Sequence, residues 1–185
     1  MTPRPGVRAL GVAESARDDR STLAGAVVRA DRVVDGAAFG SATVGGLDAT
    51  DAVVELVDGL DREDVRYLLV GAVAPAWYNV LDLGRVHEAT GLPTVAVTFE
   101  ASDGLEDALA EAFSGEALER RLERYRSLPP RRELSVNDET VYVRAVGLSD
   151  EAAADVLRTF TPEGGRPEPI RVARLLARAG ASALE

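Results

Sequence analysis

Cysteine is absent from this 185-residue chain, which excludes disulfides, thiolate metal sites and a cysteine nucleophile. Lysine is absent as well, so all 21 basic residues are arginines. Histidine occurs once, as His87, in the middle of a predicted helix and beside Glu88. A lone histidine in that setting indicates a structural or solvent-facing side chain, and it leaves no serine triad and no histidine metal cluster.

Long apolar runs are also missing. No segment reaches the roughly 18 apolar residues that a membrane span requires, and residues 1–12 lack the apolar block of a signal peptide. We therefore expect a cytoplasmic protein that does not associate with membranes. With 46% apolar residues the chain can form one domain over residues 1–185, which would bury roughly 70% of its extended surface.

Positive charge is in short supply. The chain has 31 acidic residues against its 21 arginines, giving a formal charge of -10. Such a surface repels nucleic acid at ordinary ionic strength, but at about 1 M salt the Debye length is only about 3 Å. The acidic, lysine-free composition predicts a halophilic source with a GC-rich genome. An ordinary acidic protein with arginine-biased codons is the alternative.

The first half of the chain alternates strand and helix patterns. Apolar segments at 7–12, 21–30 and 31–46 predict three strands in a meander. Residues 48–60 then carry apolar side chains at helical spacing, with Asp48 or Thr50 able to cap the first turn. A strand beginning at Tyr67, a helix from Asn79 to about Thr90 and a strand over 93–99 follow. This order predicts right-handed parallel crossovers beside the meander.

The second half is predicted to supply helices and one more strand. Residues 103–128 read as a charged helical layer that ends at a proline break, and 139–148 read as a strand. A helix over 149–160 with Ser149 as its N-cap and a terminal helix after the glycine- and proline-rich loop complete the pattern. We expect an α/β fold with a mixed sheet of five or six strands and helices on both faces.

Carboxylates are the candidate chemical groups at the predicted strand ends. Four of them follow predicted strands, namely Glu14, Asp48, Asp51 and Asp82. Oxygen ligands of this kind suit hard cations such as Mg²⁺ or Mn²⁺, and we expect all four to reach one cleft. The alternative is that the three aspartates only begin helices, where a carboxylate stabilises the helix dipole by about 0.3–1 kcal/mol.

Two further groups are candidates for binding nucleic acid. Trp77, Tyr78 and Asn79 lie in a loop where exposed rings could stack on a flipped or single-stranded base. The alternative is that Trp77 fills the core beneath the terminal helix. Arg166 and Arg171 could hold phosphate, although Arg171, Arg174 and Arg178 also fit a solvated helix face. The glycine-rich segments 44–46 and 163–169 lack the spacing of a dinucleotide or P-loop motif.

Five motifs in the same order resemble the archaeal endonuclease dU family, a distant relative of endonuclease V with a ribonuclease H-like fold. They are "RALGVAES", "VGGLDATDAV", "LLVGAVAPAWYNVLDL", "TGLPTVAV" and "GGRPEPIRVARL". The resemblance covers essentially the whole chain. It implies a DNA-repair endonuclease that acts near deoxyuridine or another deaminated base in DNA and uses a divalent cation, Mg²⁺ or Mn²⁺.

The chain departs from the family pattern where the family places metal-binding acids. Ala13, Gly45 and Val70 stand where aspartates are expected at the first strand, the following turn and the fourth strand. Glu14, Asp48 and Asp51 remain as catalytic candidates, with Glu14 and Asp48 as possible metal ligands. We expect a degenerate metal site with weak or no catalysis. A non-catalytic nucleic-acid-binding relative is one alternative, and a protein interaction module using the helical layer at 106–126 is another.

Overall fold

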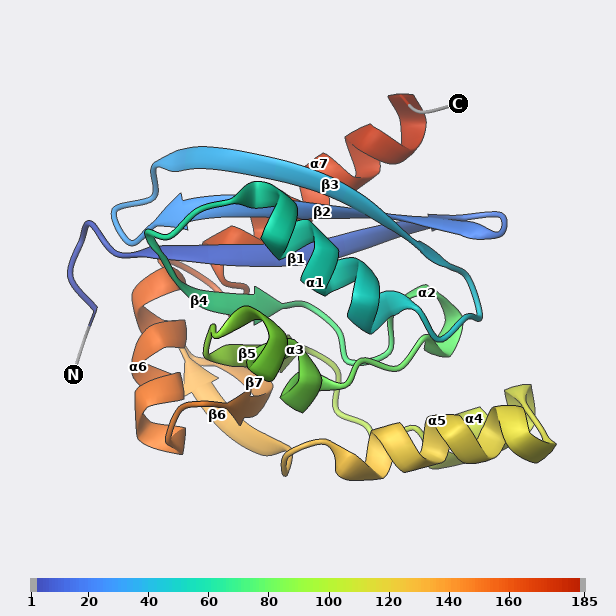
Figure 1. The fold of residues 1–185 in the computed structure, drawn as a ribbon. Helices are drawn as coiled ribbons and strands as arrows, with labels where there is room; N and C mark the ends of the chain where they lie inside the picture. The colour runs from blue at the N-terminus through green and yellow to red at the C-terminus, as the bar shows by residue number, and fades with distance from the viewer. Residues whose placement is uncertain (1–2, 184–185) are drawn as a thin grey trace.

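The computed structural model describes residues 3–183, which form one seven-stranded mixed sheet with helices on both faces (Figure 1). The strand order across the sheet is β3-β2-β1-β4-β5-β7-β6. The strands are β1 Arg8–Arg17, β2 Arg20–Arg29, β3 Val34–Thr43, β4 Val65–Val70, β5 Thr94–Thr98, β6 Arg132–Val136 and β7 Glu139–Val146. β1, β2 and β3 pair antiparallel, and β4 and β5 extend the sheet parallel to β1. The predicted meander and parallel crossovers are confirmed.

The sheet has one strand more than the five or six expected. β6 lies in the segment interpreted as a proline break, and it pairs antiparallel with β7. Asn137 and Asp138 join the two strands with φ angles of 48° and 65°. Two successive left-handed residues are what a tight two-residue hairpin requires, and asparagine and aspartate adopt that conformation most readily after glycine. The Asn-Asp pair is therefore the local cause of the extra strand.

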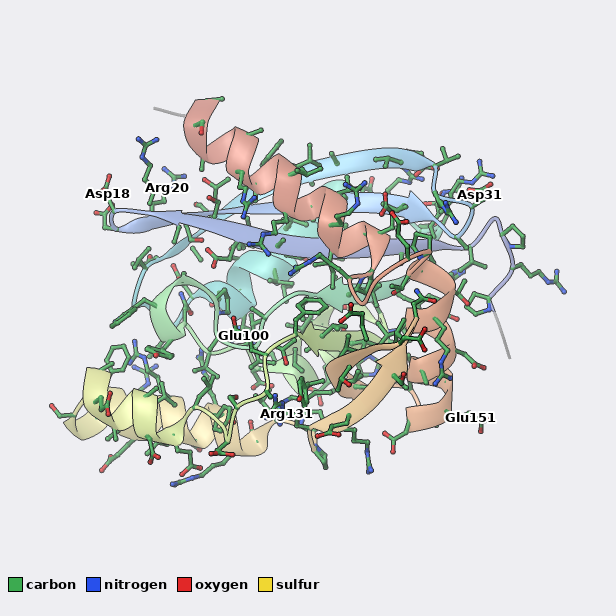
Figure 2. The ribbon with its side chains drawn as sticks, turned by 180° about the vertical axis from the view of Figure 1, so that it is seen from behind. Asp18, Arg20, Asp31, Glu100, Arg131 and Glu151 are labelled. Atoms are coloured by element: carbon green, nitrogen blue, oxygen red, sulfur yellow. The ribbon has the colours of Figure 1, made fainter. Side chains whose placement is uncertain are left out.

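Each face of the sheet has its own helices. α1 (Ala49–Leu60) and α3 (Leu83–Thr90) cover one face, where Leu10 and Val12 of β1 point. α6 (Asp150–Phe160) and α7 (Glu168–Ala183) cover the other face, where Ala9 of β1 points (Figure 2). The alternation follows from the two-residue period of a strand. None of the helices in residues 3–183 is long and apolar enough to cross a membrane.

Several predicted helix boundaries change. The helix expected from Asn79 begins at Leu83, and the carboxylate of Asp82 caps it by accepting a hydrogen bond from the Arg85 amide at 3.0 Å. The layer expected over 103–128 is two helices, α4 (Glu106–Ala112) and α5 (Gly115–Ser127), which lie side by side (Figure 1). The Ser149 cap is confirmed by the 3.2 Å hydrogen bond that its hydroxyl accepts from the Ala152 amide.

Helix α7 approaches the sheet unusually closely at Gly11. A Cβ atom placed on Gly11 would lie 2.1 Å from the carbonyl carbon of Pro169 and 2.6 Å from the amide nitrogen of Ile170. Only a residue without a side chain allows two backbones to come so near. This contact fixes α7 against β1 and therefore sets which α7 side chains reach the ends of the strands.

Candidate functional site

A cavity of about 330 Å³ opens at the C-terminal end of β4, beside the second half of β1. Ligands in open α/β sheets usually bind outside the carboxyl ends of strands, so its position is that of a functional site. It is lined by residues of β1 and β4, by Leu23 of β2, by the segment after β4, by Val53 of α1, and by α7 with the loop before it. The lining residues are Val12, Ala13, Glu14, Ser15, Leu23, Val53, Val70, Gly71, Ala72, Pro75, Leu81, Arg166, Ile170, Arg174 and Arg178.

The strand ends present apolar side chains to this cavity. Val12 and Val70 face each other in the β1–β4 pairing, and Val70 is only 2% exposed because it packs into the core beneath α1. Ala13 follows Val12 along the same wall. An alkyl side chain can neither ligate a cation nor activate water. Val12, Ala13 and Val70 therefore contribute surface and shape rather than chemistry.

Glu14 is the one carboxylate in the lining. It accepts a hydrogen bond from the Ser21 hydroxyl of β2, and a weaker one from the Ala76 amide at 3.5 Å. These bonds tie the carboxylate to β2 on one side and to the turn after β4 on the other. Glu14 is thus held in the lining of the cavity.

Three arginines supply the positive wall of the cavity. Arg166 precedes α7 and its guanidinium lies 4.1 Å from the centre of the Phe99 ring, while Arg174 and Arg178 are one helical turn apart on α7. Burial lowers the pKa of Arg166, and the neighbouring charges of Arg174 and Arg178 lower it further. Within residues 3–183 none of the three forms an ion pair with a carboxylate. The charged part of the lining therefore has a formal surplus of two positive charges.

Sequence reasoning identified only Arg166 of these three. The predicted partner Arg171 instead pairs with Glu168 at 2.6 Å on the exposed surface of α7, and it does not line the cavity. Arg166, the buried Ile170, Arg174 and Arg178 follow one another at intervals of four residues. This helical spacing is the sequence signal that could have grouped the three arginines.

Asp48 lies outside the cavity, and its carboxylate is engaged in hydrogen bonds to other parts of the fold. Its carboxylate accepts hydrogen bonds from the Thr43 amide at 3.0 Å, the Thr43 hydroxyl at 2.8 Å and the Asn79 side-chain amide at 2.7 Å. Burial alone would raise the pKa of Asp48, but these hydrogen bonds outweigh it and hold the pKa below its ordinary value. Asp48 begins α1 without capping it, since its side chain turns back to β3.

Asn79 is fully buried, which overturns its prediction as a nucleic-acid contact. Its amide nitrogen donates to Asp48 and, at 2.9 Å, to the Thr43 carbonyl, while its oxygen accepts from the Ala49 amide at 2.9 Å. All of its polar atoms are thus used to join the β3–α1 turn to the segment after β4.

The expectation that four carboxylates meet in one cleft is wrong. Asp51 forms an exposed ion pair with Arg85, and Asp82 caps α3. Among the residues that the structure describes, no three histidine, aspartate or glutamate side chains are grouped so that they could hold a metal ion. The residues present therefore do not fit the divalent cation that the resemblance implies.

The turn that follows β4 carries the exposed tryptophan. Ala76, Trp77 and Tyr78 have φ angles of 50°, 59° and 60°, so α2 (Pro75–Tyr78) contains three successive left-handed residues. Such a conformation costs roughly 1–2 kcal/mol for each non-glycine residue. Trp77 is 62% exposed, so it does not fill the core, and its ring lies 5.2 Å from that of Tyr78.

An arginine that sequence reasoning missed holds this strained turn. Arg121 of α5 is 4% exposed, and its guanidinium donates to the carbonyls of Tyr78, Gly45 and Gly46. Arg124, also on α5, donates to the Leu47 carbonyl at 2.8 Å. The turn after β3 and the turn after β4 are therefore fastened to one helix beside the cavity.

Comparison with known proteins shows similarity to the endonuclease dU family over nearly the full chain. The model of a family described as endonuclease dU matches residues 5–180. A UPF0215 protein of Thermococcus kodakarensis is 35% identical, over 95% of this chain and 93% of its own length. The crystal structure of a protein of unknown function from Archaeoglobus fulgidus superposes with a TM-score of 0.84 at 25% identity, covering 94% of this chain and 97% of that one.

Endonuclease V structures share the fold at lower identity. Ciona intestinalis endonuclease V, in complex with DNA containing an inosine followed by a ribo-adenosine, has a TM-score of 0.65 at 11% identity. The alignment covers 97% of this chain and 87% of that one. The predicted ribonuclease H-like fold is thereby confirmed.

Proposed function

The chain belongs to the endonuclease dU family, and on that premise we propose that it recognises DNA containing deaminated bases, deoxyuridine above all, with weak or no metal-dependent cleavage. The observation that carries the proposal is the cavity at the end of β4 and beside β1. It occupies the position of a ligand site, yet Val12, Ala13 and Val70 form its strand side and three arginines form its charged side. Such a lining suits an anionic ligand with an apolar part.

The weak or absent catalysis follows from the shortage of carboxylates that could hold metal ions in the cavity. Two-metal hydrolysis needs carboxylates that hold two ions about 4 Å apart and stabilise both the attacking and the leaving oxygen. Glu14 is the cavity's one carboxylate, and the oxygens of Asp48 are already engaged by Thr43 and Asn79. A cation bound by Glu14 alone would be mostly hydrated and weakly held.

The left-handed turn supports recognition of an unstacked base. Trp77 is exposed at a place where the backbone is strained, and strain of this kind is characteristic of functional segments. The turn borders the cavity through Pro75 and through the Ala76 amide that contacts Glu14. A ring at this position can stack on a base while the attached strand reaches the cavity.

Fluorescence anisotropy tests this function directly. Labelled DNA carrying one uracil, one hypoxanthine or only the four normal bases is titrated with the protein in EDTA and in Mg²⁺, at matched salt concentration. We expect the uracil-containing DNA to bind more tightly than normal DNA, equally in EDTA and in Mg²⁺. Equal, weak binding of all three DNAs would overturn the proposal and favour the helices at 106–126 as a protein interaction surface.

A further inference from the structure

Arg166, Arg174 and Arg178 stand out because three arginines line one cavity of an acidic chain. Arg62, Arg126 and Arg171 each bond to a carboxylate, and the chain has 31 acidic residues for its 21 arginines. The three cavity arginines have no carboxylate partner within residues 3–183. Neighbouring guanidinium groups repel one another, so a bound anion would relieve the repulsion and stabilise this arrangement.

We propose that Arg166, Arg174 and Arg178 bind one phosphate group of a nucleotide directly, in place of any cation, while the apolar wall of the cavity receives the attached nucleoside. This inference rests on the proposed function for the nucleotide class of the ligand. Arginine suits the task because its planar guanidinium donates two parallel hydrogen bonds to phosphate oxygens and keeps its charge at all ordinary pH values.

The fold positions these side chains in advance. The Gly11–Pro169 contact seats the first turn of α7 on β1, which places Ile170 in the cavity wall and Arg174 and Arg178 on the turns that follow. Arg166 lies before α7, and the stacking of its guanidinium on the Phe99 ring fixes its orientation. Arg166 is therefore held in place before binding, which reduces its ordering cost, whereas the exposed side chains of Arg174 and Arg178 are ordered by the ligand.

The Glu14 carboxylate distinguishes direct phosphate binding from binding through a cation. Its carboxylate lies in the same cavity and would repel a directly bound phosphate, whereas it would assist a phosphate held through a cation. Ser21 and Ala76 hold this carboxylate, and no arginine within residues 3–183 pairs with it. Glu14→Gln should therefore tighten phosphate binding in EDTA, by up to about threefold for a partly screened charge.

The experiment compares the double variant Arg174→Gln, Arg178→Gln with a control that removes the same charge elsewhere. The control is Arg132→Gln with Arg158→Gln, which lie on β6 and α6 and do not line the cavity. Three probes are used in EDTA: the uracil-containing DNA by anisotropy, and dUMP and inorganic phosphate by ³¹P NMR titration. Urea denaturation confirms that each variant is folded.

We expect the cavity variant to lose about tenfold in affinity per arginine, the value of one charge-assisted hydrogen bond, and the control to change less than twofold. If DNA binds but both variants weaken it equally, the phosphate site is wrong and the proposed function stands. If dUMP or phosphate binds through the arginines and DNA does not, the phosphate site stands and the proposed function fails. Loss of phosphate binding on Glu14→Gln would also overturn the direct site.

Discussion

The side-chain amide of Asn79 donates a 2.7 Å hydrogen bond to the carboxylate of Asp48. The two residues are 31 positions apart in the chain, and the bond joins the turn after β3 to the segment after β4. A carboxylate that would be a natural metal ligand at the start of α1 is thereby used to hold two turns together.

Replacing Asn79 by leucine should destabilise the protein. The change leaves the buried Ala49 amide without its acceptor, while Asp48 keeps its bonds from Thr43 and the Thr43 carbonyl keeps its bond from the Gly46 amide. We expect a loss of about 2 kcal/mol in the free energy of unfolding, since an unsatisfied buried group costs about 1–3 kcal/mol. Urea unfolding followed by circular dichroism measures it, and a change below about 0.5 kcal/mol would show that the network is not structural.

The same network predicts how stability depends on pH. Because the pKa of Asp48 in the folded protein lies below its ordinary value of 3.8, the ionised carboxylate stabilises the fold above that pH. This contribution is lost as the pH falls from 3.8 through the lower folded value. We expect Asp48→Asn to be less stable than the wild type at pH 6, and the difference to shrink toward pH 2. A constant difference would contradict the assigned hydrogen bonds.

Gly11→Ala should disturb both the fold and the cavity. The new methyl group would lie 2.1 Å from the Pro169 carbonyl carbon, so α7 must move away from β1. We expect a destabilisation of about 3 kcal/mol or more, at the upper end of overpacking effects, together with weaker DNA binding. The control is Gly59→Ala on the exposed side of α1, where no atom lies within 4 Å of the new Cβ. That change should leave binding unaltered and stabilise the helix by up to about 1 kcal/mol.

Trp77→Gly should separate binding from stability. Glycine adopts the left-handed conformation without strain, so the variant should be at least as stable as the wild type. Loss of the stacking ring should nevertheless weaken binding of uracil-containing DNA by about 1–3 kcal/mol. Phe39→Ala on β3, another aromatic ring that is 52% exposed, serves as the control for a general loss of exposed apolar surface. Unchanged affinity of the Trp77 variant would make the turn structural only.

Local patterns were sufficient to predict most of the sheet and the helices. The two-residue and helical periods identified six of the seven strands and both faces of the sheet. β6 escaped because only Leu134 and Val136 of its five residues are apolar, so its pattern is too short to stand out beside two prolines.

The site was harder to predict because distant contacts decide it. Asn79 looked like a loop residue, yet its three partners come from β3 and α1. Arg174 and Arg178 are exposed, and whether they also reach the cavity depends on how α7 lies on β1, which Gly11 determines through a backbone contact. The resemblance located the strand ends, while only the structure showed that arginines line them.

A cleavage assay with uracil-containing DNA tests whether the protein binds this DNA without cutting it. End-labelled DNA is incubated with excess protein in Mn²⁺ and in Mg²⁺ at molar KCl, and the products are resolved on a denaturing gel beside a parallel binding measurement. We expect the DNA to be bound and to remain uncut, with the same affinity in EDTA. Robust cleavage that requires the cation and is abolished by both a chelator and Glu14→Gln would contradict it.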